Sequence, residues 1–295
     1  MSRFMLVCNR PVKPSRHALM GNAEIVSLAS FAKAMADKPN SQTEISRPPR
    51  PGGADRSEIL YGIHTVEAAL HNPKRRIVRV LATGNAARRL APALSAAAIE
   101  PEIVAPRDLD RMADAGAVHQ GVIIEVRPLD PIRLDQVPRN ATIVLLDQVT
   151  DPQNVGAIMR SAAAFAAAAL ITTARHSPQA TSVLAKAASG AVEWVPFVKV
   201  TNLARALEEL KDYGFTVLGL DSEAPLPIDQ AGAREPVALV LGAEGKGLRR
   251  LTREKCDHLV RLDLPGPIKS LNVSNAAALA LYALRRPSTS AAPQT

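Results

Sequence analysis

Three loops of this 295-residue chain carry side chains that could do chemistry. The first follows the apolar run 142–146 and holds Asn154 and, six residues later, Arg160. Arg160 is the only charged residue between Asp151 and Arg175, and an arginine in so apolar a segment usually has a designated anionic partner. Asn154 stands where a helix would be capped, and an ordinary N-cap is the simpler interpretation of that residue taken alone.

The second loop is the glycine-rich turn 242–247, which follows the apolar run 237–241. Three glycines within six residues permit positive φ angles and a close approach of a ligand to the backbone. The spacing matches neither a phosphate-binding loop nor a Gly-x-Gly-x-x-Gly turn. The Glu244 carboxylate would repel phosphates, and it could instead contact a neutral or cationic ligand or hold Arg160.

The third loop, 264–272, places Gly266 and two prolines ahead of an apolar helix that begins with short polar side chains. Ser270, Asn272, Ser274 and Asn275 lie at a helix start, where the backbone N–H groups have no partner inside the helix and the dipole is positive. Capping explains this loop best when it is taken alone. In an open α/β sheet, however, ligands bind beyond the carboxyl ends of the strands. Three loops that each follow a predicted strand therefore favour one shared pocket.

Two stretches of alternating strand-like and helical segments must position these loops, and both indicate an α/β fold. The apolar run 142–147 is typical of a buried strand in a parallel sheet. Between the two stretches, a segment with three prolines and several charges reads as a linker. We predict a disordered basic, proline-rich tail at 1–56, an α/β domain of about 70 residues at 57–127, a linker at 128–140, a larger α/β domain at 141–287 and a disordered tail at 288–295.

The larger domain is predicted to contain five helices and five strands. The helices are expected at 154–168, 182–189, 202–213, 248–255 and 273–286, and the strands at 142–147, 169–173, 215–220, 237–242 and 258–262. In the smaller domain, helices are expected at 64–71, 85–98 and 108–115, and strands at 77–83, 101–106 and 121–126.

The overall composition limits the classes of partner and compartment. A formal net charge of +8 makes a polyanion such as nucleic acid plausible, although a merely basic surface is equally compatible. A cluster that could meet a phosphate backbone, or simply be solvated, consists of Lys74, Arg75, Arg76, Arg79, Arg88 and Arg89. Cys8 and Cys256 lack metal or disulfide spacing and the histidines do not cluster, so we expect no metal and a reducing cytoplasm. No apolar run is long enough to predict a membrane span.

Three segments resemble, in the right order, the signature motifs of the SpoU-type RNA ribose 2′-O-methyltransferases of the SPOUT superfamily. They are LLDQVTDPQNVGAIMRSAAAF, LVLGAEGKGLRRLT and DLPGPIKSLNVSNAAALALY, and the similarity covers about residues 57–286. The smaller domain, with YGIHTVEAAL and HQGVIIEV, resembles the family's RNA-binding domain, which is itself similar to ribosomal protein L30e. The arrangement is similar to that of the bacterial 23S ribosomal RNA (rRNA) guanosine-2′-O-methyltransferases.

The resemblance implies a trefoil-knotted methyltransferase domain, a homodimer with the last helix at its interface, and S-adenosylmethionine (S-adenosyl-L-methionine) as cofactor. The cofactor-binding positions that it implies are Leu241, Gly242, Glu244, Gly245, Leu262, Leu264, Gly266, Ser270 and Leu271. The catalytic positions that it implies are Asn154, Arg160, Glu244, Ser270 and Asn272. Lys269 adds a cation beside the cofactor turn, which bears on cofactor affinity. Two alternatives stay open: a transfer RNA (tRNA) ribose methyltransferase, and a non-catalytic RNA-binding assembly factor that has kept the fold.

Overall fold

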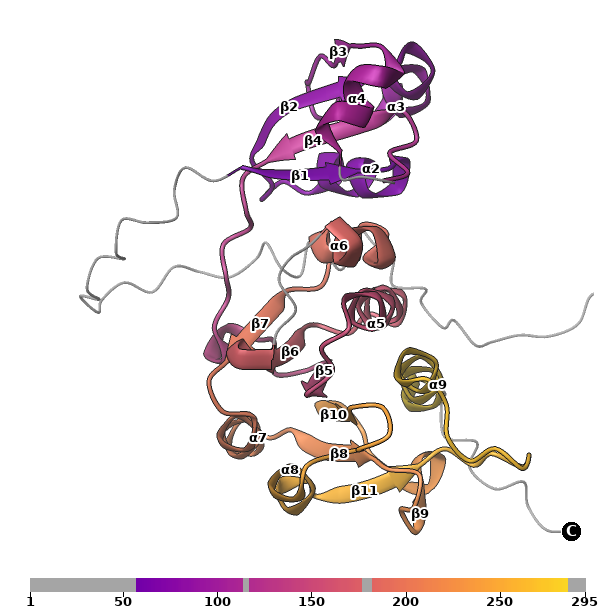
Figure 1. Ribbon diagram of the computed structural model, residues 1–295. Helices are drawn as coiled ribbons and strands as arrows, with labels where there is room; N and C mark the ends of the chain where they lie inside the picture. Colours follow the sequence, from indigo (N-terminus) through magenta and orange to yellow (C-terminus); the bar gives the residue numbers. More distant parts are fainter. Residues whose placement is uncertain (1–56, 114–116, 177–181, 286–295) are drawn as a thin grey trace, which may run out of the picture. The chain divides into compact units, whose positions relative to one another are not determined.

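The computed structural model describes residues 57–113, 117–176 and 182–285 (Figure 1). All of them belong to one compact unit, Gly53–Thr295. The tails predicted at 1–56 and 288–295 lie outside the described residues, as does the end of the helix predicted at 108–115. None of the described helices is long and apolar enough to cross a membrane.

A four-stranded mixed sheet forms in the first part of the chain. Its strands are β1 (Glu58–Tyr61), β2 (Ile77–Ala82), β3 (Glu102–Ile103) and β4 (Val122–Val126), in the order β1-β4-β2-β3. The helices are α2 (Ile63–His71), α3 (Gly84–Ala96) and α4 (Pro106–Met112). Val66, Leu90 and Ile124 lie in the core between α2, α3 and the sheet. The strand β1 was not predicted, and the strand expected at 101–106 is only the two-residue β3.

The second sheet has seven strands, and every pairing within it is parallel, which confirms the predicted parallel sheet. Its strands are β5 (Thr142–Asp147), β6 (Leu170–Thr173), β7 (Phe197–Val200), β8 (Thr216–Leu220), β9 (Leu226–Pro227), β10 (Val237–Gly242) and β11 (His258–Arg261). Their spatial order is β7-β6-β5-β10-β8-β11-β9. The residues of β5 are all buried, as the apolar run predicts.

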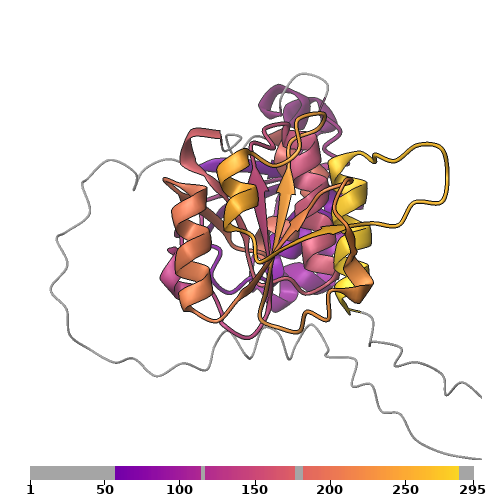
Figure 2. The ribbon, with the colours of Figure 1, turned by 90° about the horizontal axis from the view of Figure 1, so that it is seen from below.

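Helices cover both faces of the large sheet (Figure 2). They are α5 (Pro152–Ala164), α6 (Ser182–Ala188), α7 (Leu203–Asp212), α8 (Arg250–Lys255) and α9 (Val273–Arg285), with a short 3₁₀ helix η3 (Ala191–Glu193) after α6. One core cluster joins α5, α6 and α9 to one face of the sheet, and another joins α7 to the opposite face. The first motif and the last helix are therefore neighbours in space.

The helix predicted at 154–168 begins two residues earlier and ends four residues earlier than expected. Asp151, not Asn154, is the N-cap: its carboxylate accepts hydrogen bonds from the backbone N–H groups of Gln153 and Asn154. Asn154 therefore lies inside the first turn and its side chain is free for other contacts. At the other end, Ala166 takes a φ of 53° and stops the helix.

Glycine at position 156 lets α5 and α6 approach closely. A Cβ at Gly156 would lie 2.5 Å from the Cβ of Ala187 and 2.7 Å from the carbonyl oxygen of Leu184. Any side chain there would overlap α6, because real Cβ atoms do not make such short contacts. This packing fixes the orientation of α5, the helix that carries Asn154 and Arg160.

Candidate active site

The loop after β5 and the glycine turn after β10 leave the sheet side by side. The two strands are paired in parallel, with Gly242 opposite Asp147 at their carboxyl ends. The carboxyl edge of a parallel sheet is where ligands bind in open α/β folds. Helix α9 packs against α5, which brings the third loop to the same region.

Asn154, Glu244 and Asn272 form one hydrogen-bonded network at this edge. Glu244 Oε1 accepts from Asn272 Nδ2 at 2.6 Å and from Asn154 Nδ2 at 3.2 Å. Asn272 Nδ2 also donates to Asn154 Oδ1 at 3.0 Å. Residues from all three predicted loops are thus in direct contact. Asn154 is 90 residues from Glu244 and 118 residues from Asn272 in the sequence.

The same network caps helix α9. Glu244 Oε1 accepts from the backbone N–H of Val273 at 3.3 Å, and Asn272 Oδ1 accepts from the backbone N–H of Ser274 at 2.9 Å. A carboxylate at the N-terminus of a helix is favoured by the helix dipole. Capping and a shared polar site are therefore not alternatives here, because the same side chains do both.

A buried carboxylate outside the predicted set of site residues anchors the glycine turn. Asp147, at the end of β5, is fully buried. It accepts from the backbone N–H of Arg249 at 2.9 Å and from Arg249 Nε at 2.6 Å. Its position in the sequence could have identified it, because a carboxylate at the end of an apolar, buried strand needs hydrogen-bond donors nearby. This ion pair ties the far end of the turn to the first motif.

The glycine turn 242–247 closes tightly on itself. A Cβ on Gly242 would lie 2.2 Å from the backbone carbon of Gly247, so only glycine fits there. Gly245 and Gly247 have φ angles of 73° and 64°, which favour glycine. The turn leaves Glu244 accessible, with its carboxylate directed into the Asn154–Glu244–Asn272 network.

The third loop is mostly exposed and presents apolar side chains beside its backbone groups. Lys269 Nζ donates to the carbonyl oxygen of Leu264 at 2.7 Å and so closes the segment 264–269 on itself. Ile268 and Leu271 are 71% and 38% exposed. Backbone donors and acceptors beside aliphatic side chains suit a ligand with an uncharged heteroaromatic ring, and the chemistry of this loop therefore fits the adenosine part of S-adenosylmethionine.

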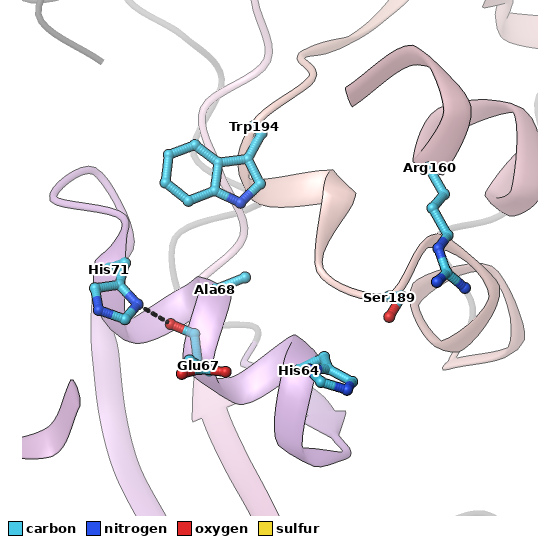
Figure 3. Close-up of a pocket in the computed structure, with 7 residues that line it drawn as sticks. All are labelled: His64, Glu67, Ala68, His71, Arg160, Ser189 and Trp194. Atoms are coloured by element: carbon cyan, nitrogen blue, oxygen red, sulfur yellow. Dashed lines mark hydrogen bonds between the residues drawn. The ribbon is translucent and has the colours of Figure 1, made fainter. Parts of the chain in front are cut away.

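Arg160 and Ser270 do not join this network through any contact between described residues. Ser270 lies in the exposed third loop. Arg160 is exposed, makes no hydrogen bond or ion pair with another described residue, and extends from α5 toward Ser189 (Figure 3). It lines a cavity together with residues of α2 and Trp194. Three of the five predicted catalytic side chains are therefore in contact, and Arg160 faces a neighbouring cavity.

Comparison with known proteins covers both parts of the chain. Residues 141–282 match the model of the SpoU rRNA Methylase family, and residues 59–132 match the model named RNA 2′-O ribose methyltransferase substrate binding. The 23S rRNA (guanosine-2′-O-)-methyltransferase RlmB of Haemophilus influenzae is 42% identical over 241 residues, which are 78% of this chain and 98% of that protein. RlmB of Escherichia coli K12 is 38% identical over 236 residues, 77% of this chain and 97% of that protein.

A solved structure shows the same fold. The SpoU methyltransferase AviRb from Streptomyces viridochromogenes, in complex with the cofactor AdoMet, superposes with a TM-score of 0.64 at 25% sequence identity. The match covers 77% of this chain and 89% of AviRb. AdoMet is S-adenosylmethionine, the ligand whose chemistry the third loop fits.

Proposed function

Because this chain belongs to the SpoU rRNA methylase family, we propose that it transfers a methyl group from S-adenosylmethionine to the ribose 2′-hydroxyl of a guanosine in 23S rRNA. The observation that carries the proposal is the contact of Asn154, Glu244 and Asn272, one residue from each of the three motifs. The RlmB relatives, which this chain spans almost completely, support the choice of 23S rRNA and guanosine. A cytoplasmic location fits such a substrate.

The cofactor would be held by the second and third motifs. When bound, S-adenosylmethionine supplies a methyl group that its positively charged sulfur has already activated. The tight glycine turn 242–247 and the exposed loop 264–271 offer backbone groups, and Ile268 and Leu271 offer apolar surface for a ring. Lys269 is engaged with Leu264 and so has a structural role in the loop. The trefoil knot that the resemblance implies is part of this proposal.

The network leaves specific groups available for the ribose. Within the described part of the chain, Asn272 uses both amide N–H donors and its oxygen, whereas Asn154 keeps one N–H and Glu244 keeps Oε2. One donor and one acceptor, held by a shared carboxylate, can orient a hydroxyl group that both gives and accepts a hydrogen bond. We assign Asn154 and Glu244 to positioning the ribose and Asn272 to fixing both of them.

Arg160 would act on the phosphate of the target nucleotide. A guanidinium has N–H donors and no acceptor, so it is not the base. It can hold a phosphate whose oxygen takes the 2′-hydroxyl proton as attack proceeds. Asn154 and Arg160 are six residues apart on α5, which is a rise of about 9 Å along the helix. A nucleotide and an extended arginine side chain can together cover this distance.

The test is a methylation assay with labelled S-adenosylmethionine and, separately, deproteinised 23S rRNA, 16S rRNA and transfer RNA. We expect label on the 2′-oxygen of a guanosine in 23S rRNA, located by mapping the ribose methylation. Label confined to transfer RNA would replace the substrate assignment. Cofactor binding without label in any RNA would favour the non-catalytic assembly factor.

We further propose that two copies of the chain associate through α9. The helix exposes Leu279 and Tyr282, which are 46% and 53% accessible, and small alanines flank them on the same helix. Exposed large apolar side chains beside small ones permit close helix packing and are typical of an interface.

Replacing Leu279 by lysine is expected to weaken self-association by about tenfold or more, because a charge would be buried in an apolar contact. Sedimentation velocity at several concentrations measures this. Leu251 on α8 is 54% exposed, and Leu251→Lys is the matched control that should leave association unchanged. Equal association of Leu279→Lys and the unaltered chain would exclude α9 as the contact.

A further inference from the structure

The cavity that Arg160 faces has a volume of about 370 Å³ and lies between α2 and the segment that ends at Trp194 (Figure 3). Helix α2 contributes His64, Glu67 and His71, α5 contributes Arg160, and the opposite wall contributes Ser189 and Trp194. Helix α2 belongs to the region that matches the substrate-binding model, and the other elements belong to the methylase region. The cavity is therefore built jointly by the two matched regions.

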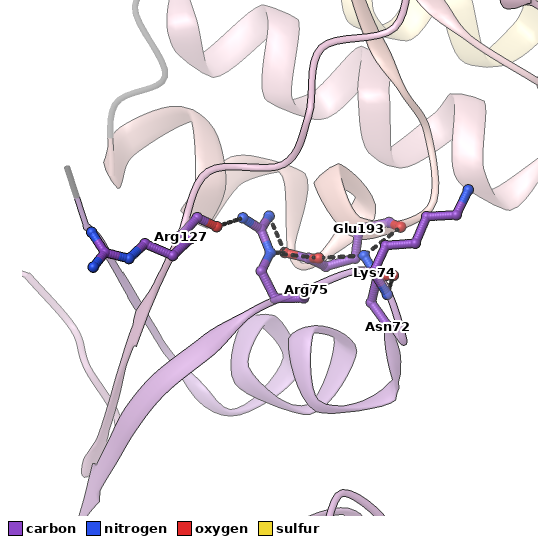
Figure 4. A network of polar contacts seen from close by, with 5 residues as sticks. All are labelled: Asn72, Lys74, Arg75, Arg127 and Glu193. Atoms are coloured by element: carbon purple, nitrogen blue, oxygen red, sulfur yellow. Dashed lines mark hydrogen bonds and ion pairs between the residues drawn. The ribbon is translucent and has the colours of Figure 1, made fainter. Parts of the chain in front are cut away.

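A buried polar network holds the two walls together (Figure 4). Arg75 Nη2 donates to Glu193 Oε1 at 2.7 Å, and their side chains are 4% and 0% exposed. Asn72 Nδ2 donates to Glu193 Oε2 at 2.8 Å. Asn72 directly follows His71 and Glu193 directly precedes Trp194, so the network fixes cavity residues on both sides.

Close backbone packing adds a second constraint. Gly190 has a φ of 85°, and a Cβ there would lie 2.6 Å from the Cβ of Ala68 and 3.0 Å from the carbonyl oxygen of His64. The walls meet at a point where only glycine fits. A site whose walls are fixed in this way is pre-organised for a ligand, and ordering the walls takes little from the binding free energy.

The side chains of the cavity match the parts of one nucleotide. Single-stranded RNA is recognised by stacking its bases on aromatic side chains and by hydrogen bonds to their Watson–Crick edges. Trp194 offers a stacking surface and Arg160 a phosphate-binding guanidinium. Glu67 offers only acceptors, and it would repel a phosphate, so it must face the base.

The carboxylate selects among the bases. Guanine presents two neighbouring donors, N1–H and the N2 amino group, to one carboxylate, whereas the other bases offer a single donor group on that edge. We infer that this cavity binds a guanine of the substrate RNA, stacked on Trp194, read by Glu67 and held at its phosphate by Arg160. The inference rests on the proposed function, because it assumes an RNA substrate.

Trp194 makes the inference directly measurable, since it is the only tryptophan of the chain. Titration of the full chain with the trinucleotide UpGpU is expected to quench its fluorescence, with an affinity about tenfold or more above that for UpApU. Glu67→Gln should remove this preference and raise the KM for 23S rRNA by about tenfold with little change in kcat. Glu100→Gln, which changes an exposed glutamate of the same region outside the cavity, is the matched control and should behave like the unaltered chain.

The outcomes separate this inference from the proposed function. Methylation of 23S rRNA without quenching of Trp194, or with an unchanged KM in Glu67→Gln, overturns the guanine site and leaves the methyltransferase assignment intact. Guanine-selective quenching without methylation of any RNA supports the guanine site and overturns the assignment.

Discussion

Arg160→Ala is expected to lower the rate of methyl transfer by about 100-fold or more. Removing one preorganised donor to a reacting group has an effect of this size. The affinity for S-adenosylmethionine should change little, because Arg160 has no contact with the turns 242–247 and 264–272 among the described residues. The fold should also persist, since the side chain is exposed and leaves no buried partner behind. Single-turnover rates and calorimetric cofactor binding measure the two quantities separately.

Two further variants define what the guanidinium contributes. Arg160→Lys keeps the charge but loses the planar pair of donors, so an intermediate rate is expected. Arg250→Ala removes an exposed arginine that pairs with Glu254 on α8 and should leave the rate unchanged. Loss of cofactor binding in Arg160→Ala would reassign the residue to the cofactor site, and an unchanged rate would remove it from the reaction.

The buried strands were predictable because their pattern is dictated by burial on both faces. The strand β10 lies at 237–242, as its continuous apolar run indicates. The strands β7 and β9 were missed because neither carries such a pattern: β7 lies at one sheet edge with Lys199 exposed, and the two-residue β9 lies at the other and includes Pro227. Their strand conformation depends on pairing with β6 and β11.

The predicted helix 154–168 was too long because alanine favours helices wherever it occurs. In the structure, the alanines at 167–169 are buried and lead into β6. The backbone N–H of Ala168 donates to the carbonyl oxygen of Thr142, and that of Val144 to the carbonyl oxygen of Ala169. Pairing with β5 thus overrides local propensity, and no local sequence signal reveals it.

The grouping of the three loops could be predicted, whereas the direction of each side chain could not. Asn154 and Arg160 are six residues apart, which puts their side chains about 240° apart around an α-helix, and the structure gives them separate surroundings. The partner of Arg75 could not be predicted from the sequence either. Arg75 was grouped with residues that could contact phosphate or be solvated, and this was wrong: it is buried against Glu193, which is 118 residues away.

Arg75→Ala is expected to lower the free energy of unfolding by about 3–5 kcal/mol, because breaking a buried ion pair leaves an uncompensated charge. Glu193, whose side chain is fully buried, would keep Asn72 as its remaining side-chain donor among the described residues. Urea unfolding measures the loss, and hydrogen exchange around residues 72–75 and 191–195 shows whether it appears first as local opening.

The matched control is Arg79→Ala, which breaks the partly exposed pair with Glu125 and should lower the free energy of unfolding far less than Arg75→Ala does. Replacing both partners, Arg75→Met with Glu193→Leu, should recover most of the loss, since no charge is left buried. An equally small effect of Arg75→Ala and Arg79→Ala would mean that water reaches the Arg75–Glu193 pair in solution. The walls of the cavity lined by Glu67 and Trp194 would then lack their main constraint. Binding of the guanine would have to order these walls.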